Sequence, residues 1–176
     1  MLFRSEIDRW IISELNTLIK NVDACYADYE PTRAGRLIND FVNDNLSNWY
    51  VRLCRKRFWG AGYTEDKLAA YQTLYTCLET VVKLMAPIAP FYADKLYMDL
   101  VGATGRDTVD SVHLAQFPVC DESLVDKELE MRMELAQKVS SMGLALRKKV
   151  NIIVKQPLQK LMIPVDAELK ARLEAV

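Results

Sequence analysis

Apolar positions in the first third of the chain recur every three or four places, which is the spacing of amphipathic helices. Ser5 and Asp8 have the spacing of a capping box, which predicts that the first helix begins there. Pro31 is compatible only with the first turn of a helix, so it ends this helix and begins a second one. We expect the second helix to extend to about Phe58, before Gly60. The apolar stripe of the first helix is formed by Ile7, Ile11, Leu15, Leu18, Val22, Cys25 and Tyr29.

The same spacing predicts three more helices in the rest of the chain. They cover residues 65–85, 90–101 and 123–149. The stretch from 102 to 121 is expected to be a loop with a short extended piece at 112–117. Short connections between long helices favour an antiparallel bundle.

The hydrophobic pattern changes after residue 149. Residues 151–155 and 158–164 resemble two short strands, and a last amphipathic piece begins at Asp166. Two strands alone do not form a stable sheet, so this end is interpreted as the start of a truncated C-terminal junction module. The expected fold is therefore all-α, an antiparallel bundle of about five helices over residues 1–149 with a short β/α appendage over 150–176.

Composition excludes several classes of protein. A chain of 176 residues with 51% hydrophobic and 27% charged residues is not disordered. No apolar stretch approaches the roughly 20 residues of a membrane span, and the first residues lack a secretory signal. The formal net charge of -1 excludes a bulk polycation that coats nucleic acid unselectively. We therefore expect a cytoplasmic protein with no membrane partner.

The chain offers little for catalysis or metal binding. Its single histidine, His113, lies in a short apolar segment without a nucleophile signature. The cysteines Cys25, Cys54, Cys77 and Cys120 are scattered, whereas zinc sites usually take their ligands in close pairs. We expect four reduced and mostly buried thiols, no metal site and no catalytic residue in this chain.

The near-neutral net charge hides two basic segments. Residues 31–60 contain six basic and two acidic side chains, and residues 135–165 contain six basic and no acidic ones. Segregation of charge by sign on a neutral chain indicates a localised anionic partner. The basic residues are Arg33, Arg36, Arg52, Arg55, Lys56 and Arg57 in the first segment and Lys138, Arg147, Lys148, Lys149, Lys155 and Lys160 in the second.

The densest basic stretch covers residues 48–59. On a helical wheel, an arc of about 100° is expected to face water. This arc contains Asn48, Arg52, Arg55, Lys56 and Trp59. The opposite arc, which is expected to pack in the bundle, contains Val42, Leu46, Trp49, Tyr50, Leu53 and Cys54. Cations for phosphates, an amide for a base edge and an indole for stacking are the groups that bind single-stranded RNA. On composition alone, an ordinary solvated helix face is the stronger interpretation.

Five segments resemble the anticodon-binding helical domain of isoleucyl-tRNA synthetases, which are class I enzymes. The first three are DRWIISELNTLI at 8–19, YEPTRAGRLINDFVNDNLSNWYVRLCRKRFW at 29–59 and MAPIAPF at 85–91. The pieces SVHLAQFP at 111–118 and ALRKKVNIIVKQPLQKLMIP at 145–164 follow in the same order as in that family. The resemblance covers nearly the whole chain. MAPIAPF is its least specific part, because the related valyl and leucyl enzymes have similar turns.

The resemblance implies that this chain is part of a larger ATP-dependent isoleucine–tRNA ligase. The family's nucleotide-binding signatures HIGH and KMSKS are absent here, so the parent enzyme would use ATP and Mg in a domain outside this chain. This chain would hold no cofactor and would bind the anticodon stem-loop of the isoleucine tRNA, beside the catalytic and C-terminal domains of the parent. In that role Arg52, Arg55 and Lys56 are assigned to phosphates, Trp59 to stacking and Asn48 to a base edge.

Two alternatives remain open from the sequence. The chain could be a helical protein-interaction module that adds its apolar segments at 152–154 and 161–163 to a partner's sheet. It could also be the equivalent domain of a valyl- or leucyl-tRNA synthetase, which competition among the three anticodon arms would reveal.

Overall fold

The computed structural model describes residues 5–105, 109–160 and 162–163. The chain forms two compact units, Met1–Val125 and Asp126–Val176, and each unit is described by itself. The described residues contain helices and no strand, which confirms the all-α fold class. The expected domain boundary after residue 149 stays a prediction. Within the described ranges, no helix is both long enough and apolar enough to cross a membrane.

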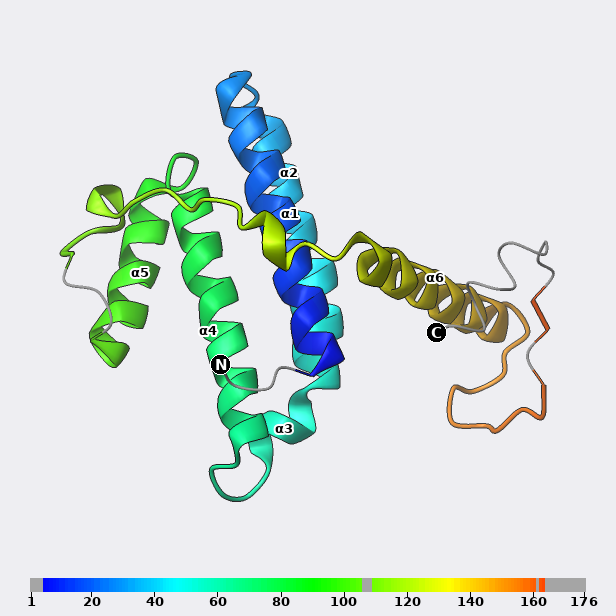
Figure 1. The fold of residues 1–176 in the computed structure, drawn as a ribbon. Coiled ribbons are helices and arrows are strands. Elements are labelled where there is room, and N and C mark those ends of the chain that lie inside the picture. Colours follow the sequence, from blue (N-terminus) through cyan, green and yellow to red (C-terminus); the bar gives the residue numbers. More distant parts are fainter. Residues whose placement is uncertain (1–4, 106–108, 161, 164–176) are drawn as a thin grey trace. The chain divides into compact units, whose positions relative to one another are not determined.

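The first unit is a bundle in which consecutive long helices are antiparallel. Figure 1 shows that α1 and α4 run in one direction and that α2 and α5 run in the other. This alternation agrees with the arrangement that the short connections predicted. The helices are α1 (Glu6–Ala27), α2 (Pro31–Asp40), the π-helix η1 (Phe41–Val51), α3 (Arg55–Trp59), α4 (Glu65–Met85) and α5 (Pro90–Thr104).

Helix α1 supplies much of the buried apolar surface of this unit. Trp10, Ile11, Leu15 and Val22 are almost completely buried, and α1 packs against α2, η1 and α4. A second cluster joins α4 and α5, and it contains Val82, Ala86, Ala93, Tyr97, Val101 and Val112. Burial of apolar side chains stabilises the bundle by about 25 cal/mol for each Å² removed from water.

The helix starts follow local capping rules. The Asp8 carboxylate accepts the backbone N–H of Ser5 at 3.1 Å, which confirms the predicted start of α1. The Thr64 hydroxyl accepts the backbone N–H of Lys67 at 3.2 Å and fixes the start of α4. Helix α5 continues three residues past its expected end at 101, and it ends before Gly105, whose φ of 61° suits a residue without a side chain.

The predicted second helix is not one continuous α-helix. It begins as α2, widens into the π-helix η1, turns at Cys54 and resumes as the five-residue α3. From Phe41 onward its buried residues are four or five positions apart, namely Phe41, Leu46, Tyr50, Cys54 and Phe58. This spacing exceeds the 3.6 residues of an α-turn. Backbone bonds to the fifth residue, which define a π-helix, bring such widely spaced side chains onto one face.

Two expectations for the stretch between α5 and the last helix are wrong. The extended piece expected at 112–117 is wrong for its first half, because Val112–Leu114 form the 3₁₀ turn η2, and the backbone becomes extended only at Ala115. The Asp94 carboxylate holds this turn by accepting the Ser111 hydroxyl at 2.7 Å and the Val112 N–H at 3.0 Å. The last helix does not begin at 123, where Glu122–Leu124 form a separate turn, η3.

At its described residues, the second unit contains α6 (Lys127–Lys149) and an irregular segment after it. The Asp126 carboxylate accepts the Leu129 N–H at 3.0 Å and so caps α6. The strand expected at 151–155 is wrong. The Arg147 guanidinium donates to the carbonyls of Ile153 and Gln156 at 3.0 and 2.9 Å, which holds the segment in turns.

The second expected strand, at 158–164, is irregular at its described residues, and the rest of it lies outside them. The amphipathic piece expected from Asp166 to the last residue lies wholly outside the described residues.

Candidate nucleic-acid interface

The five residues proposed to contact RNA all lie at exposed positions of one segment in the first unit. Asn48 belongs to η1, Arg52 to the connection after it, and Arg55, Lys56 and Trp59 to α3. Their side chains are therefore open to a ligand in this unit, as the wheel predicted. Their contact with nucleic acid stays a prediction.

Trp59 is the exposed aromatic side chain of α3, whereas Phe58 beside it is buried. Its exposed fraction is 75%, and the Arg55 guanidinium carbon lies 5.2 Å from the centroid of its ring. A guanidinium at this distance attracts the negative face of an indole. The pair therefore presents a cation and an open aromatic surface side by side, which are the two groups that a nucleotide needs for phosphate pairing and base stacking.

The wheel placed one residue on the wrong side. Leu53 was expected to pack in the bundle, but 54% of its side chain is exposed. A wheel drawn at 100° per residue assumes an α-helix, whereas the eleven residues before Arg52 are π-helical.

The ring of Phe58 lies beneath the surface, and its centroid is 6.3 Å from that of Tyr50 and 5.3 Å from that of Tyr71. These edge-on contacts anchor α3 on the bundle.

Arg57 belongs to the basic run but does not face a ligand. Its guanidinium donates to both carboxylate oxygens of Asp8, each at 2.8 Å. It also donates to both carboxylate oxygens of Asp66, at 2.9 and 2.7 Å. Asp8 lies in α1 and Asp66 in α4, so one side chain of α3 is held to two other helices. Paired donors and acceptors in this fork arrangement fix orientation as well as distance.

Electrostatics keep this cluster charged. Burial raises the pKa of Asp8, but hydrogen bonds from Arg57, Tyr50 and Ser5 outweigh it, so that the pKa of Asp8 lies below its ordinary value. The hydrogen bond to Asp8 raises the pKa of Arg57. Burial, followed by the hydrogen bond that the Tyr50 hydroxyl donates to Asp8 at 2.7 Å, raises the pKa of Tyr50.

Residues after α3 extend the exposed surface beyond those that the sequence indicated. Tyr63 lies in the loop before α4 with 86% of its side chain exposed, and the Lys67 amine is 5.4 Å from its ring centroid. Lys67 also donates to the Gly60 carbonyl at 2.8 Å, and the Tyr71 hydroxyl donates to the Phe58 carbonyl at 3.2 Å. The helix pattern gave no signal for Tyr63, because loop aromatics have no periodicity to reveal them.

The second basic segment lies in the other unit. Lys148, Lys149, Lys155 and Lys160 are exposed. Arg147 is instead directed at backbone carbonyls, so it serves the fold of this segment rather than a ligand. This second set of cations is described by itself, because the two units are separate bodies.

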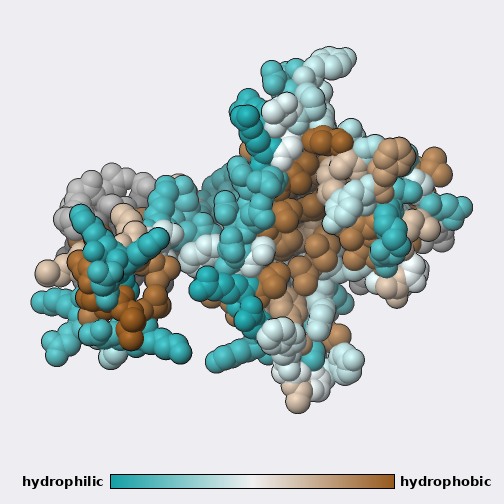
Figure 2. All heavy atoms as spheres, turned by 180° about the vertical axis from the view of Figure 1, so that it is seen from behind, coloured by the Kyte–Doolittle hydropathy of each residue, from teal (hydrophilic) through white to brown (hydrophobic). Residues whose placement is uncertain are grey.

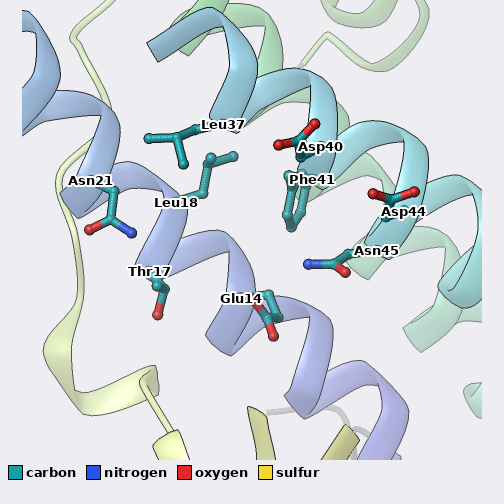
Figure 3. A pocket seen from close by; sticks show the side chains of 9 residues that line it. All are labelled: Glu14, Thr17, Leu18, Asn21, Leu37, Asp40, Phe41, Asp44 and Asn45. Carbon is teal, nitrogen blue, oxygen red and sulfur yellow. The ribbon is translucent and has the colours of Figure 1, made fainter. Parts of the chain in front are cut away.

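Two hollows of the first unit are unsuited to phosphate. A cleft of about 200 Å³ between α1, α2 and η1 contains the carboxylates of Glu14, Asp40 and Asp44 (Figure 3). These negative charges repel a nucleic acid. A groove of about 430 Å³ between α2, η1, α4 and α5 is lined mainly by apolar residues, among them Val42 and Leu78.

Figure 2 shows apolar side chains gathered on one face of this unit. The five candidate RNA contacts lie instead within the exposed segment from 48 to 59. Among the described residues, no group of three or more His, Cys, Asp or Glu side chains could hold a metal ion.

Comparison with known proteins gives one consistent result. The family model described as "Anticodon-binding domain of tRNA ligase" matches residues 8–162. The isoleucine–tRNA ligase of Bacteroides fragilis is 74% identical over 174 residues, which is 98% of this chain and 15% of that protein. The ligase of Bacteroides thetaiotaomicron is 72% identical over 177 residues, covering 100% of this chain and 15% of that protein.

A more distant relative agrees. The isoleucine–tRNA ligase of Dehalococcoides mccartyi is 51% identical over 158 residues, which is 90% of this chain and 16% of that protein. The chain thus spans about one sixth of the length of the curated relatives it matches. With a helical bundle that carries exposed cations beside an open indole, and a family match from the first helix to beyond α6, the chain belongs to the anticodon-binding domains of tRNA ligases.

Proposed function

We propose that this chain is the part of an isoleucine–tRNA ligase that binds the anticodon stem-loop of the isoleucine tRNA and so positions that tRNA for aminoacylation elsewhere in the enzyme. The observation that carries the proposal is the family match over residues 8–162, together with relatives at 72–74% identity that are named isoleucine–tRNA ligases. The alternative of a protein-interaction module is not favoured by these matches.

The task of this domain is positioning rather than chemistry. Phosphate contacts set the register of a nucleic acid on a protein, and base contacts set its specificity. Arg52, Arg55 and Lys56 supply exposed cations for phosphates, Trp59 supplies a stacking surface, and Asn48 supplies an amide for a base edge. ATP and Mg²⁺, which the aminoacylation reaction uses, belong to the catalytic domain of the parent enzyme, which acts in the cytoplasm.

The proposal predicts RNA binding that depends steeply on salt. Each phosphate neutralised on a single strand contributes about 0.7 to the slope of log affinity against log salt. Changing Arg52, Arg55 and Lys56 together to Ala is expected to weaken binding of the anticodon stem-loop and to lower the slope by about 2. The helical circular dichroism spectrum of the chain should be unchanged in this variant, because the three side chains are exposed and do not pack in the bundle.

A matched control separates a local surface from general charge. Arg33, Arg36 and Lys95 are also exposed cations of the first unit, and their joint change to Ala removes the same charge. This control variant should bind nearly as tightly as the unchanged chain. Equal weakening in both variants, or no preference for the isoleucine arm over the valine and leucine arms in competition, would contradict the proposal.

A further inference from the structure

Helix α3 carries three of the five proposed RNA-contacting residues but cannot hold its own direction. It has only five residues, and isolated helices shorter than about 12 residues are marginal in water. The chain turns at Cys54, with φ -81° and ψ 3°, and becomes extended at Gly60, with φ -57° and ψ 148°. The orientation of α3 must therefore come from contacts of its side chains with longer helices.

Arg57 provides the polar part of this anchorage. Its fork of donors engages Asp8 of α1 and Asp66 of α4 through two oxygens each, and it also donates to the Asp66 carbonyl at 3.1 Å. A planar guanidinium bound on two edges has little freedom to rotate. Since Arg57 adjoins Lys56 in the chain and lies two residues from Trp59, its orientation determines where these exposed groups stand.

Arg57 does not contribute charge to the surface. One guanidinium is balanced by two carboxylates, so the cluster of Arg57, Asp8 and Asp66 offers no surplus cation to a phosphate. Only 17% of the Arg57 side chain is exposed. An effect of this cluster on RNA binding must therefore act through geometry.

We propose that Arg57, held by Asp8 and Asp66, is a positioning residue of the RNA-binding surface: it orients α3 so that Arg55, Lys56 and Trp59 engage the anticodon stem-loop together. The inference rests on the function proposed above and assigns Arg57 a role that its place in a basic run does not suggest.

Asp66→Asn tests this role, because electrostatics and positioning predict opposite results. Asp66 is 58% exposed at its side chain, so the substitution leaves the buried pair of Arg57 and Asp8 in place. Removing a negative charge beside the RNA should tighten binding if charge alone matters. Positioning instead predicts binding weakened by about fivefold, because the amide cannot accept both guanidinium donors. The matched control is Asp99→Asn on α5, whose carboxylate is 59% exposed and paired with Lys95.

A second measurement asks whether Asp66 acts through the cations of the surface. Asp66→Asn is introduced into the variant in which Arg52, Arg55 and Lys56 are Ala, and the anticodon stem-loop is titrated at fixed salt. Most of the weakening seen in the unchanged background should disappear, since groups that act as one unit are not additive. Unchanged or tighter binding by Asp66→Asn, or full additivity with the triple change, overturns the positioning role while the unchanged chain still binds. Failure of the unchanged chain to bind overturns the proposed function itself.

Discussion

Arg57 and Asp8 meet through two hydrogen bonds of 2.8 Å, although 49 residues separate them in the chain. The Asp8 carboxylate is fully buried, and its remaining partners are the Tyr50 hydroxyl and Ser5. A single carboxylate therefore caps α1, satisfies a buried tyrosine and fixes α3. The pairing joins the first helix of the bundle to the segment with the greatest density of cations.

Loss of Arg57 should destabilise the bundle strongly. Arg57→Ala leaves the buried Asp8 carboxylate without its cation, and removing one partner of a buried pair costs about 3 kcal/mol or more. Urea denaturation followed by circular dichroism measures this loss of unfolding free energy. Lys95→Ala, which breaks the exposed pair with Asp99, should change the free energy by less than about 1 kcal/mol. Similar losses in both variants would contradict the buried role of Arg57.

Stability should fall in acid in a way that depends on Asp8. The pKa of Asp8 in the folded chain lies below its ordinary value of 3.8, so the unfolded chain binds this proton more readily. The stabilisation is complete above that ordinary value and is lost as the pH falls through the lower, folded pKa. Asp94 and Asp121 have lowered pKa values as well, so the unchanged chain loses stability from several carboxylates.

The contribution of Asp8 is isolated by difference. Urea midpoints of the unchanged chain and of Asp8→Asn are compared at about pH 6 and about pH 3. The variant should be less stable at the higher pH, and the gap between the two proteins should narrow at the lower pH. A gap that is constant across this range would show that Asp8 does not titrate with folding.

The indole of Trp59 should matter for RNA and hardly at all for folding. Base stacking on an aromatic side chain is worth about 1 to 3 kcal/mol, so Trp59→Ala should weaken binding of the anticodon stem-loop by about fivefold or more. Trp59→Phe should retain most of the affinity, because it keeps an aromatic face. Since Trp59 is 75% exposed, unfolding free energies should differ by less than about 0.5 kcal/mol. Equal RNA affinities of the alanine variant and the unchanged chain would remove Trp59 from the site.

Thiol reactivity should distinguish Cys120 from the other cysteines. Cys25, Cys54 and Cys77 are buried, whereas Cys120 is partly exposed. Burial also raises the pKa of Cys54, which disfavours its reactive thiolate. In native conditions a disulfide reagent should modify one thiol quickly, and Cys120→Ser should abolish that fast reaction. In denaturant all four cysteines should react. A second fast thiol in the native chain would indicate that the bundle opens readily.

Much of the bundle was predictable from the sequence, because helix ends have local signals. Ser5 and Thr64 mark helix starts because their side chains form hydrogen bonds with the first turn. Pro31 marks a helix start because proline has no backbone N–H to donate inside a helix. The β/α appendage was mispredicted at 151–155, where β-branched residues favoured a strand. The Arg147 guanidinium binds the carbonyls of that segment, and no propensity reports such a contact.

The candidate site shows the same division between local and distant information. The exposure of Arg52 and Arg55 agreed with the wheel, because the basic and apolar positions of that segment segregate. The burial of Arg57 had no signal in the sequence, since its neighbours in the run RKR carry the same charge. Its partners lie in two helices far away in the chain, and a single sequence does not record which distant carboxylates meet a given cation.

The π-helix η1 has a consequence for how this segment tolerates changes in length. A π-helix has more residues per turn than an α-helix, so the eleven residues of η1 turn through a smaller angle than eleven α-helical residues. The apolar side chains before and after it share one face only because of that difference. A chain that lost one residue between Phe41 and Val51 could keep Tyr50 buried and Arg55 in solvent only by tightening toward the fewer residues per turn of an α-helix. The number of residues in this stretch, and not their chemistry alone, therefore determines which side chains of residues 48–59 face solvent.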